Sequence, residues 1–400
     1  MEPTREAALA RMHEFVPRMG GHYMQHRNHD LGPADRTNVS NLSPWIRRRL
    51  VLESEVAQAA LDEHGPRAAE KFVQEVVWRT YWKGWLEQRP QVWDDYLYEL
   101  ADEIEKLDRY GDARADYERA VEGRTGIEPF DDWARELIET GTLHNHARMW
   151  FASIWVFTLR LHWTLGADFF LRHLLDGDPA SNTLSWRWVA GLHTSGKHYL
   201  ATSDNIAKFT GGRYRLPKNA LAGGVDAPEW EPVERHPLPR PEKPKDVPSL
   251  LLVTEDDCSP MTLDLPPVTR AIVVPSAHRR SPLDVGEKVL AFERGALVDA
   301  ATRLGENGIE AELVEADALA ETIERLAPRQ IVGAELPVGP ARDALLPILA
   351  DVEAPFRPTR RPWDEKFWPH ATAGFFKLKK AIPKVFAELA REGDKSTERT

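Results

Sequence analysis

Apolar residues recur at helical spacing through most of residues 1–226. The clearest helical stretches are residues 53–64, 68–86, 131–140 and 144–161, and each has a Gly or Pro near one end. Strand-like alternation of apolar and polar residues is scarce in this part of the chain. The pattern therefore predicts an all-α domain over residues 1–226.

The composition changes after residue 226. Residues 227–248 are rich in proline, which lacks a backbone donor and favours extended conformations, so we interpret them as a linker. Beyond this linker, short apolar runs alternate with helical patterns. The runs that predict strands are residues 249–253, 271–274, 312–314 and 330–333, and the predicted helices are residues 285–304, 316–326 and 340–349.

This alternation is typical of a parallel sheet with helices on both faces. It predicts a Rossmann-like α/β domain over residues 249–385, without a phosphate-binding glycine fingerprint or metal-ligand spacing. The polar residues 386–400 are expected to form a flexible tail. The expected fold class is therefore a multidomain chain, in which an all-α domain is followed by an α/β domain.

Length and composition agree with this organisation. The chain has 400 residues and is 42% hydrophobic, which allows two or three domains with a sizeable core. The single cysteine, Cys258, excludes an intrachain disulfide and any four-cysteine metal site. No charged-then-apolar leader opens the sequence, and no apolar run approaches the roughly 18 residues that cross a bilayer. We therefore expect a cytoplasmic protein without membrane association.

The formal net charge of −11 argues against tight binding to duplex DNA, whose phosphates attract basic surfaces. Charges that are segregated can still form local basic patches. The triplet Arg47-Arg48-Arg49 and the stretch 208–218 are candidates for such patches, and they fit solvated helix ends equally well.

The most informative chemistry lies between residues 144 and 188. Asn145 and Arg148 lie one helical turn apart, on a helix that the apolar residues after them are expected to bury. A buried guanidinium needs an anionic partner, which Asp176 or Asp178 can supply. Gly177 between these two acids leaves room for a planar ligand. The arrangement suits a redox cofactor, although Asp-Gly-Asp alone also fits a helix cap with a structural ion pair.

Three further motifs precede this region. Residues 23–27 have the pattern Tyr-x-x-x-Arg, residues 39–45 read Val-Ser-Asn-Leu-Ser-Pro-Trp, and residues 75–79 read Glu-Val-Val-Trp-Arg. In this order, and together with Asp-Gly-Asp, they resemble the flavin pocket of the photolyase and cryptochrome family. The resemblance covers roughly residues 20–215.

The resemblance implies FAD as the cofactor. The turn at residues 39–45 is expected to hold the pyrophosphate through hydroxyls and free N–H groups ahead of a helix, unless it is an ordinary serine cap. Arg148, paired with Asp176, is expected to stabilise an anionic flavin, and Asn182 to face its N5 edge. The full set of expected FAD-binding residues is Tyr23, Ser40, Asn41, Leu42, Ser43, Arg148, Asp176, Asp178 and Asn182.

The same resemblance implies a cavity for a damaged pyrimidine pair. Aromatic side chains that stack on a flipped base, with polar groups that read its edge, suit enzymes that extrude their target from the duplex. Glu75 is expected to hydrogen-bond the lesion and to stabilise its radical anion. The expected substrate-binding residues are Glu75, Trp78, Arg79, Asn145, Met149 and Trp188.

The family also uses a wire of aromatic residues that brings electrons from the surface to the photoexcited flavin. Trp186 matches its proximal member and Trp163 its middle member, and counting back from Asn145 places the distal member near Tyr110. Any one of the 14 tryptophans also fits a simple packing role. The residues expected to carry the chemistry are Glu75, Asn182, Trp186, Trp163 and Tyr110.

The sequence departs from the family pattern at several positions. Val39 replaces the first Thr of the phosphate turn, Thr80 replaces the acid that follows Trp-Arg, and residues 191–205 differ from the corresponding stretch of well-known dimer photolyases. These departures bear on the lesion more than on the flavin. His144 and His146 are candidates for proton transfer on a (6-4) product, or for packing.

In the family, an α/β domain that can bind an antenna chromophore precedes the helical domain, whereas here the α/β pattern follows it. Residues 295–380 resemble that antenna domain in their order of helices and strands, which implies a permuted chain and a possible second chromophore. An unrelated partner-binding or regulatory α/β domain fits the pattern about as well. The aromatic and basic stretch 363–382 is expected either to pack against the helical domain or to contact DNA.

The function implied by the resemblance is that of a deoxyribodipyrimidine photolyase-like lyase. In such an enzyme, an electron from reduced FAD splits a pyrimidine dimer in UV-damaged DNA, single- or double-stranded, under blue light. The alternative is a cryptochrome-like photoreceptor that signals through a protein partner. Glu75, Trp78, Arg79 and Met149 favour repair, while the acidic surface and the domain order favour the sensor.

Overall fold

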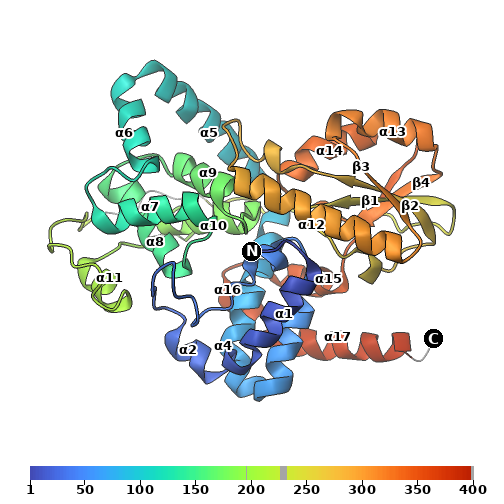
Figure 1. Cartoon of the computed structure of the whole chain (residues 1–400), viewed down its shortest axis with the longest axis horizontal. Helices are drawn as coiled ribbons and strands as arrows, with labels where there is room; N and C mark the ends of the chain where they lie inside the picture. Colours follow the sequence, from blue (N-terminus) through green and yellow to red (C-terminus); the bar gives the residue numbers. More distant parts are fainter. Residues whose placement is uncertain (195, 226–231, 398–400) are drawn as a thin grey trace.

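The computed structural model describes residues 1–194, 196–225 and 232–397. A helical part lies on the left of Figure 1 and an α/β part on its right, with the N-terminus between them. Residues 227–231 of the predicted linker and 398–400 of the predicted tail lie outside the described residues. The expected fold class, a helical region followed by a parallel α/β region, is confirmed.

The helical part is built around one long helix, α4 (Glu53–Glu87), which bends at Gly65. Gly65 has a φ of 70° and precedes Pro66, so it interrupts the helical hydrogen bonds between the predicted stretches 53–64 and 68–86. The other helices of this part are α1 (Arg5–Phe15), α2 (Gly21–His26), α3 (Ser43–Arg47), α5 (Gln91–Arg109), α6 (Gly111–Val121), α7 (Glu128–Thr140), α8 (Asn145–Ser153), α9 (Trp163–His173), α10 (Pro179–Ala190) and α11 (Ser203–Phe209).

The α/β part contains a five-stranded parallel sheet with the order β3-β2-β1-β4-β5. Its strands are β1 (Ser249–Thr254), β2 (Val268–Val274), β3 (Glu310–Leu313), β4 (Gln330–Ala334) and β5 (Phe356–Thr359). The helices are α12 (Glu287–Glu306), α13 (Leu319–Leu326) and α14 (Pro340–Asp351), as the sequence predicts to within a few residues. Strand β5 was not predicted, because Pro358 interrupts a run of only four half-buried residues.

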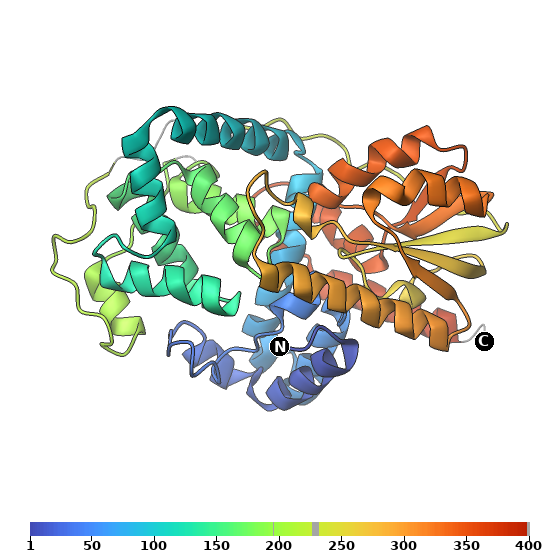
Figure 2. The ribbon, with the colours of Figure 1, turned by 45° about the horizontal axis from the view of Figure 1, so that its top comes forward.

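The two faces of the sheet are buried against different partners. Leu250 and Leu252 of β1 belong to a small core with α13 and α14, on one face. Leu251 and Val253 point the other way and join a larger core that includes α12 and the helical part. The helical and α/β parts therefore share one continuous core, as their close apposition in Figure 2 illustrates. The residue boundaries proposed for separate domains stay a prediction.

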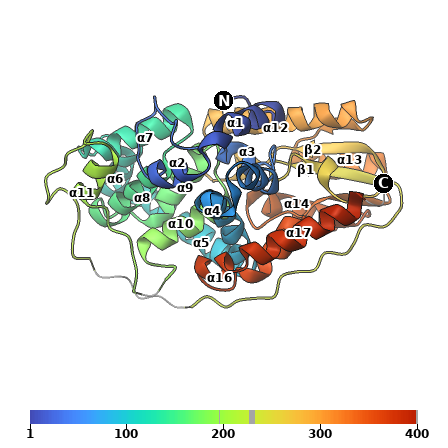
Figure 3. The same cartoon turned by 90° about the horizontal axis from the view of Figure 1, so that it is seen from below.

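The chain after the sheet returns to the helical part. Helices α15 (Pro362–Phe367) and α16 (Phe375–Lys379) lie along α4, and α17 (Ile382–Thr397) runs back toward the sheet (Figure 3). The Trp363 indole N–H donates to Thr80 Oγ1 of α4 at 2.9 Å. Residues 386–397, expected to be part of a flexible tail, belong to α17, because Phe386 packs on Trp363 and Phe367.

The predicted linker takes an extended path in its described residues, 232–248. Its backbone is held at three places. The His236 N–H donates to Gln88 O at 2.8 Å, Arg360 Nη2 donates to Pro239 O at 2.9 Å, and the Gln330 side chain bonds both the N–H and the carbonyl of Lys245. Figure 3 shows this segment passing along one edge of the molecule.

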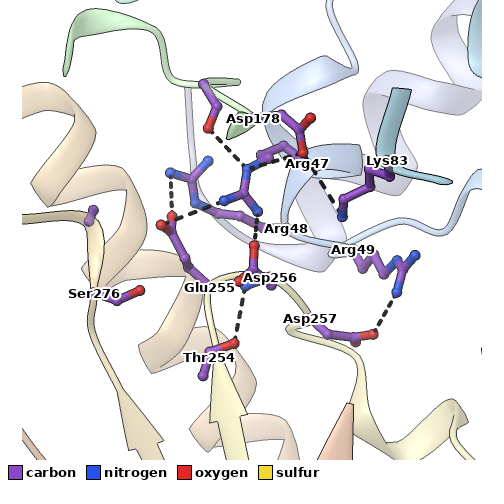
Figure 4. A network of polar contacts seen from close by, with 12 residues as sticks. Arg47, Arg48, Arg49, Lys83, Asp178, Thr254, Glu255, Asp256, Asp257 and Ser276 are labelled. Carbon is purple, nitrogen blue, oxygen red and sulfur yellow. Dashed lines mark hydrogen bonds and ion pairs between the residues drawn. The ribbon is translucent and has the colours of Figure 1, made fainter. Parts of the chain in front are cut away.

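The triplet Arg47-Arg48-Arg49 lies in the interface between the two parts (Figure 4), so the expectation of an exposed basic patch or of solvated helix ends was wrong. The three side chains face Glu255-Asp256-Asp257, which directly follow β1. Arg47 Nη1 lies 2.6 Å from Asp256 Oδ1, and Arg48 Nη2 lies 3.3 Å from Glu255 Oε2. Buried guanidinium groups require such partners, and these come from a segment about 200 residues away in the sequence.

Candidate functional site: a cavity between α4, α8 and α10

A cavity of about 680 Å³ opens in the helical part. Its walls come from α2, the turn before α3, α4, α8 and α10. Such a volume is typical of cofactor and drug-sized ligand sites. Except for Trp163 and Tyr110, every residue that the sequence predicts for the site lines this cavity: Tyr23, Ser40, Asn41, Leu42, Ser43, Glu75, Trp78, Arg79, Asn145, Arg148, Met149, Asp176, Asp178, Asn182, Trp186 and Trp188.

The turn at residues 39–45 leads into α3 at one end of the cavity. Asn41 has a φ of 55°, a left-handed conformation that asparagine tolerates better than most residues. Arg11 of α1 fixes this turn from outside, because its Nε donates to Ser40 O at 2.8 Å and its Nη2 to Val39 O at 3.1 Å. The sequence did not point to Arg11, since nothing in its own segment marks it.

Arg148 and Asp176 form the ion pair that the sequence predicts. Arg148 Nη2 lies 2.9 and 3.1 Å from the two carboxylate oxygens of Asp176, and Arg148 Nε donates to Leu143 O at 2.9 Å. Burial opposes ionisation of Asp176, but Arg148 and Arg79 outweigh it and hold the pKa of this carboxyl below its usual value. The pair is therefore charged and fixed in direction at the cavity wall.

Asp178 lies deeper and has a second role. Its Oδ1 accepts from the Ser181 N–H at 2.7 Å and so caps α10. Burial again opposes ionisation, but Lys83, Arg79 and Arg47 lower the pKa of Asp178 to about 2. The helix-cap alternative thus describes Asp178, while Asp176 forms the ion pair.

Several buried polar atoms of the cavity have no hydrogen-bond partner among the described residues. They are Ser181 Oγ, Arg79 Nη1 and Asp178 Oδ2, and the last of these has only the longer ion-pair contacts with Arg47 and Lys83. Buried polar groups are nearly always hydrogen-bonded, so unpaired ones in a cavity wall indicate a polar ligand. Asn182, whose Nδ2 donates to Ala167 O at 2.7 Å, is held with its amide at the same wall. These groups fit a large, polar, partly aromatic cofactor such as FAD.

The part of the wall expected to bind a substrate lies mainly on α4. The Glu75 carboxylate lies 3.1 Å from Arg27 Nη1 and 2.9 Å from Lys71 Nζ. The Trp78 ring is stacked on Phe375 of α16, with ring centroids 3.8 Å apart and an angle of 11° between the planes. Sequence reasoning missed Lys71 and Phe375, because each acts through a neighbour that only the fold brings close.

The far wall completes the lining. Trp188 is 36% exposed and stacks on Tyr199 with ring centroids 5.8 Å apart. Met149 is half-buried and Asn145 exposed, both on α8. Aromatic, thioether and amide groups therefore face the same space as the α4 residues.

The aromatic wire is only partly assembled as the sequence suggests. Trp186 lines the cavity, and Trp163 lies buried beside Tyr96, with ring centroids 5.8 Å apart. Tyr110 is 61% exposed at the far end of α5. Tyr110 follows Tyr96 by 14 positions, which correspond to about 21 Å along this helix. The structure therefore does not bring Tyr110 next to Trp163.

Two other aromatic residues extend from Trp163 instead. Tyr96 lies 5.1 Å from Trp93 between ring centroids, and the Trp93 indole N–H donates to Asp343 Oδ2 of α14 at 2.7 Å. The Trp163 indole N–H donates to Glu99 Oε2 at 3.1 Å. Counting along the sequence could not identify these residues, because Trp93 and Tyr96 lie on α5 and come next to Trp163 only in the fold.

The two histidines beside Asn145 are bound to the backbone. One ring nitrogen of His144 lies 3.0 Å from Arg27 O, and one of His146 lies 2.9 Å from Asn28 O. Burial lowers the pKa of His144 to about 3 and also lowers that of His146. Neutral, backbone-bound rings agree with the packing alternative.

Residues 72–210 match the family model described as the FAD binding domain of DNA photolyase. This match agrees with the resemblance of the helical part to the photolyase and cryptochrome family. The FAD predicted from the sequence is thereby confirmed as the cofactor of this domain type. A second chromophore stays a prediction.

Curated relatives agree with this assignment. A deoxyribodipyrimidine photo-lyase of Streptomyces griseus is 36% identical over 167 residues, which cover 42% of this chain and 34% of the relative. A deoxyribodipyrimidine photo-lyase of Thermus thermophilus is 33% identical over 211 residues, covering 51% of this chain and 47% of the relative. The chain thus spans between a third and a half of the length of these relatives.

Two solved structures are similar in part. A class III photolyase of Agrobacterium tumefaciens has a TM-score of 0.44 at 26% identity and covers 52% of this chain and 43% of its own. A cryptochrome of Synechocystis has a TM-score of 0.42 at 21% identity, with the same coverage. Among the residues that the structure describes, no helix is long and apolar enough to cross a membrane.

Proposed function

We propose that this protein is a blue-light-driven DNA photolyase that splits pyrimidine dimers in UV-damaged DNA. The observation that carries the proposal is a single cavity that joins two sets of groups. The Arg148–Asp176 pair and Asn182 suit a flavin, and Trp78, Trp188 and the α4 polar residues suit a flipped base pair. A reduced flavin bound there would supply the light-driven electron.

The protein's own contribution is charge placement and orientation. Arg148 keeps an N–H face toward the cavity while its position is fixed by Asp176 and by Leu143 O. A fixed guanidinium stabilises negative charge on a bound ring without reorganisation at the moment of reaction. Asn182 contributes an amide that is held by Ala167 O.

Glu75, Trp78 and Arg79 would hold the lesion. One face of Trp78 is covered by Phe375, and other atoms of the indole line the cavity, where they can stack on a base. Arg79 and Glu75 can hydrogen-bond a pyrimidine edge, and Glu75 has two cations beside it that balance its charge. The lesion, a cyclobutane dimer or a (6-4) product, depends on these contacts.

The test is light-dependent splitting of a defined cyclobutane thymine dimer in single- and double-stranded oligonucleotides. Purified protein is loaded with FAD, photoreduced and compared with a dark control. We expect splitting only in the light. Absence of splitting from a flavin-loaded, photoreducible protein would contradict the proposal for this lesion, and the same assay with a (6-4) substrate would then decide between lesions.

A second candidate function is that of a cryptochrome-like photoreceptor with a protein partner. The Trp93–Asp343 hydrogen bond favours it, because it joins the aromatic residues beside Trp163 to helix α14 of the α/β part. Light-dependent protection changes in α14, measured by hydrogen exchange on a protein that photoreduces without splitting any dimer, would support this function.

A further inference from the structure

We propose that the exposed face of α16, formed by Phe376, Lys377 and Lys380, is the surface that receives the DNA strand flanking the lesion. This inference deepens the proposed function and rests on it for the identity of the strand. It concerns a helix from beyond the sheet, outside the segment 72–210 that matches the FAD binding domain.

Helix α16 lies beside the wall of the cavity. Phe375 is buried and stacked on Trp78, with ring centroids 3.8 Å apart, and Trp78 lines the cavity. The next residue, Phe376, points away from this contact, and its ring lies 6.3 Å from that of Phe375. Phe376 is therefore connected to the cavity wall through two ring contacts, with Phe375 and then with Trp78.

The side chain of Phe376 is unusually exposed. Phe376 is 74% exposed, although a large apolar side chain normally gains by burial. The neighbouring Leu378 and Phe375 are buried in the core, so α16 is folded and docked while Phe376 stands out from it. An isolated exposed aromatic is ordinary, but one beside cations and next to a base-sized cavity suits stacking on an unpaired base.

The α16 segment is rich in lysine. The chain has a net charge of −11, yet α16 and the residue after it hold Lys377, Lys379 and Lys380. Lys379 lies 3.1 Å from Glu70 of α4, which docks the helix. Lys377 and Lys380 are exposed and have no ion pair among the described residues, which leaves both charges for phosphates.

The neighbouring acids do not cancel this charge. Glu70 is already paired with Lys379, and Glu388 of α17 lies 3.7 Å from Lys384. On the cavity side of α4, Lys71 and Arg27 flank Glu75. A strand that enters the cavity beside Trp78 would thus meet cations on both sides of α4, and a polyanion with unpaired bases is the partner that fits.

The test is the dark affinity of the FAD-loaded protein for a fluorescein-labelled single-stranded thymidine oligonucleotide, with and without one cyclobutane dimer. We expect K377E/K380E to weaken binding of both oligonucleotides and to reduce the slope of log affinity against log salt by about 1.4, the value for two phosphate contacts on a single strand. F376A is expected to weaken binding about tenfold through loss of one stacked base.

Two matched controls lie away from this face. The double change K288E/R294E, on α12 at the opposite edge of the molecule in Figure 3, alters the net charge equally on exposed side chains. Tyr98→Ala, on α5, removes another exposed aromatic residue. Both controls should bind as the wild type does, and all variants should keep their flavin absorbance.

The outcomes separate the two proposals. Wild-type affinity in K377E/K380E and F376A, or losses no greater than in the two controls, would overturn the DNA surface while leaving light-driven splitting untouched. Selective loss of binding in the α16 variants, together with no splitting of either lesion by the wild type, would support the surface and reject the photolyase reaction. Failure of the wild type to bind either oligonucleotide would overturn the DNA surface, and splitting in the duplex oligonucleotide would then decide the reaction.

Discussion

The Glu75 carboxylate lies 2.9 Å from the Lys71 amino group, one helical turn earlier on α4, and 3.1 Å from Arg27. Ion pairs with two cationic neighbours hold this carboxylate in one place. A lesion bound in the cavity would therefore meet a pre-positioned hydrogen-bond acceptor, as well as the positive charge that holds it.

Glu75→Gln should impair dimer splitting while flavin binding persists. The amide keeps the size of the side chain and loses the charge, and a hydrogen bond to a charged group is worth about 2 kcal/mol, or roughly 30-fold. The measurements are single-turnover splitting under blue light and the FAD content of the purified protein. Equal loss of both would reject a role in the reaction, and Glu63→Gln, an exposed site on the same helix, is the matched control.

Asp176→Asn should weaken FAD binding by about 10- to 100-fold, because the change leaves the Arg148 guanidinium without its anionic partner in a half-buried site. FAD affinity can be measured by fluorescence on deflavinated protein. Asp317→Asn breaks a comparable ion pair with Arg279 on the surface and should leave the affinity unchanged. If both variants bound FAD equally well, Asp176 would have no place in the flavin site.

The stability of the protein should depend on pH through Glu87. Burial raises the pKa of Glu87 to about 7, above its ordinary value near 4.5. The folded protein then holds this proton more tightly than the unfolded chain, so stability falls as the pH rises from about 4.5 to 7 and stays low above that.

Glu87→Gln removes this titration and keeps an acceptor for the Val338 N–H, which bonds Glu87 Oε1 at 2.6 Å. We expect the difference in free energy of unfolding between pH 5 and pH 8 to shrink by about 2 kcal/mol. Urea unfolding at the two pH values measures it. An unchanged difference would mean that Glu87 titrates normally in the folded protein.

Flavin photoreduction should require Trp163 and not Tyr110. Trp163→Phe is expected to reduce the rate of photoreduction to the level of Trp186→Phe, whereas Tyr110→Phe is expected to match the wild type. The reason is distance: Tyr110 lies at the opposite end of α5 from Tyr96, the residue beside Trp163. The rate is followed by flavin absorbance under continuous blue light, and slow photoreduction in Tyr110→Phe would restore Tyr110 to the wire.

The sequence predicted the cavity better than its surroundings. Arg148, Asp176 and Asn182 lie in local motifs whose spacing fixes their positions, and the structure places all three at one wall. Tyr110 was placed by counting back from Asn145 across α7 and α6, where residue number carries no information about direction in space. The long helix leads it away from Trp163.

Contacts between distant segments were beyond reach of the sequence for a different reason. Arg47-Arg48-Arg49 looked like surface charge because charged residues are rarely buried without partners. Their partners, Glu255-Asp256-Asp257, follow an apolar strand and looked equally ordinary. Only the pairing of the two runs, shown in Figure 4, makes burial of both favourable.

The pairing of these two charged runs also determines whether the helical and α/β parts can exist apart. Residues 1–226 expressed alone would turn three guanidinium groups and an apolar surface toward water, and the isolated sheet would expose three acids at the end of β1. The described linker residues, 232–248, are held mainly by single hydrogen bonds, to Gln88, Gln330 and Arg360. The helical and α/β parts should therefore fold only together. Cleavage of the linker should leave two fragments that stay associated, whereas reversing the charge of one of the three buried arginines should destabilise both parts.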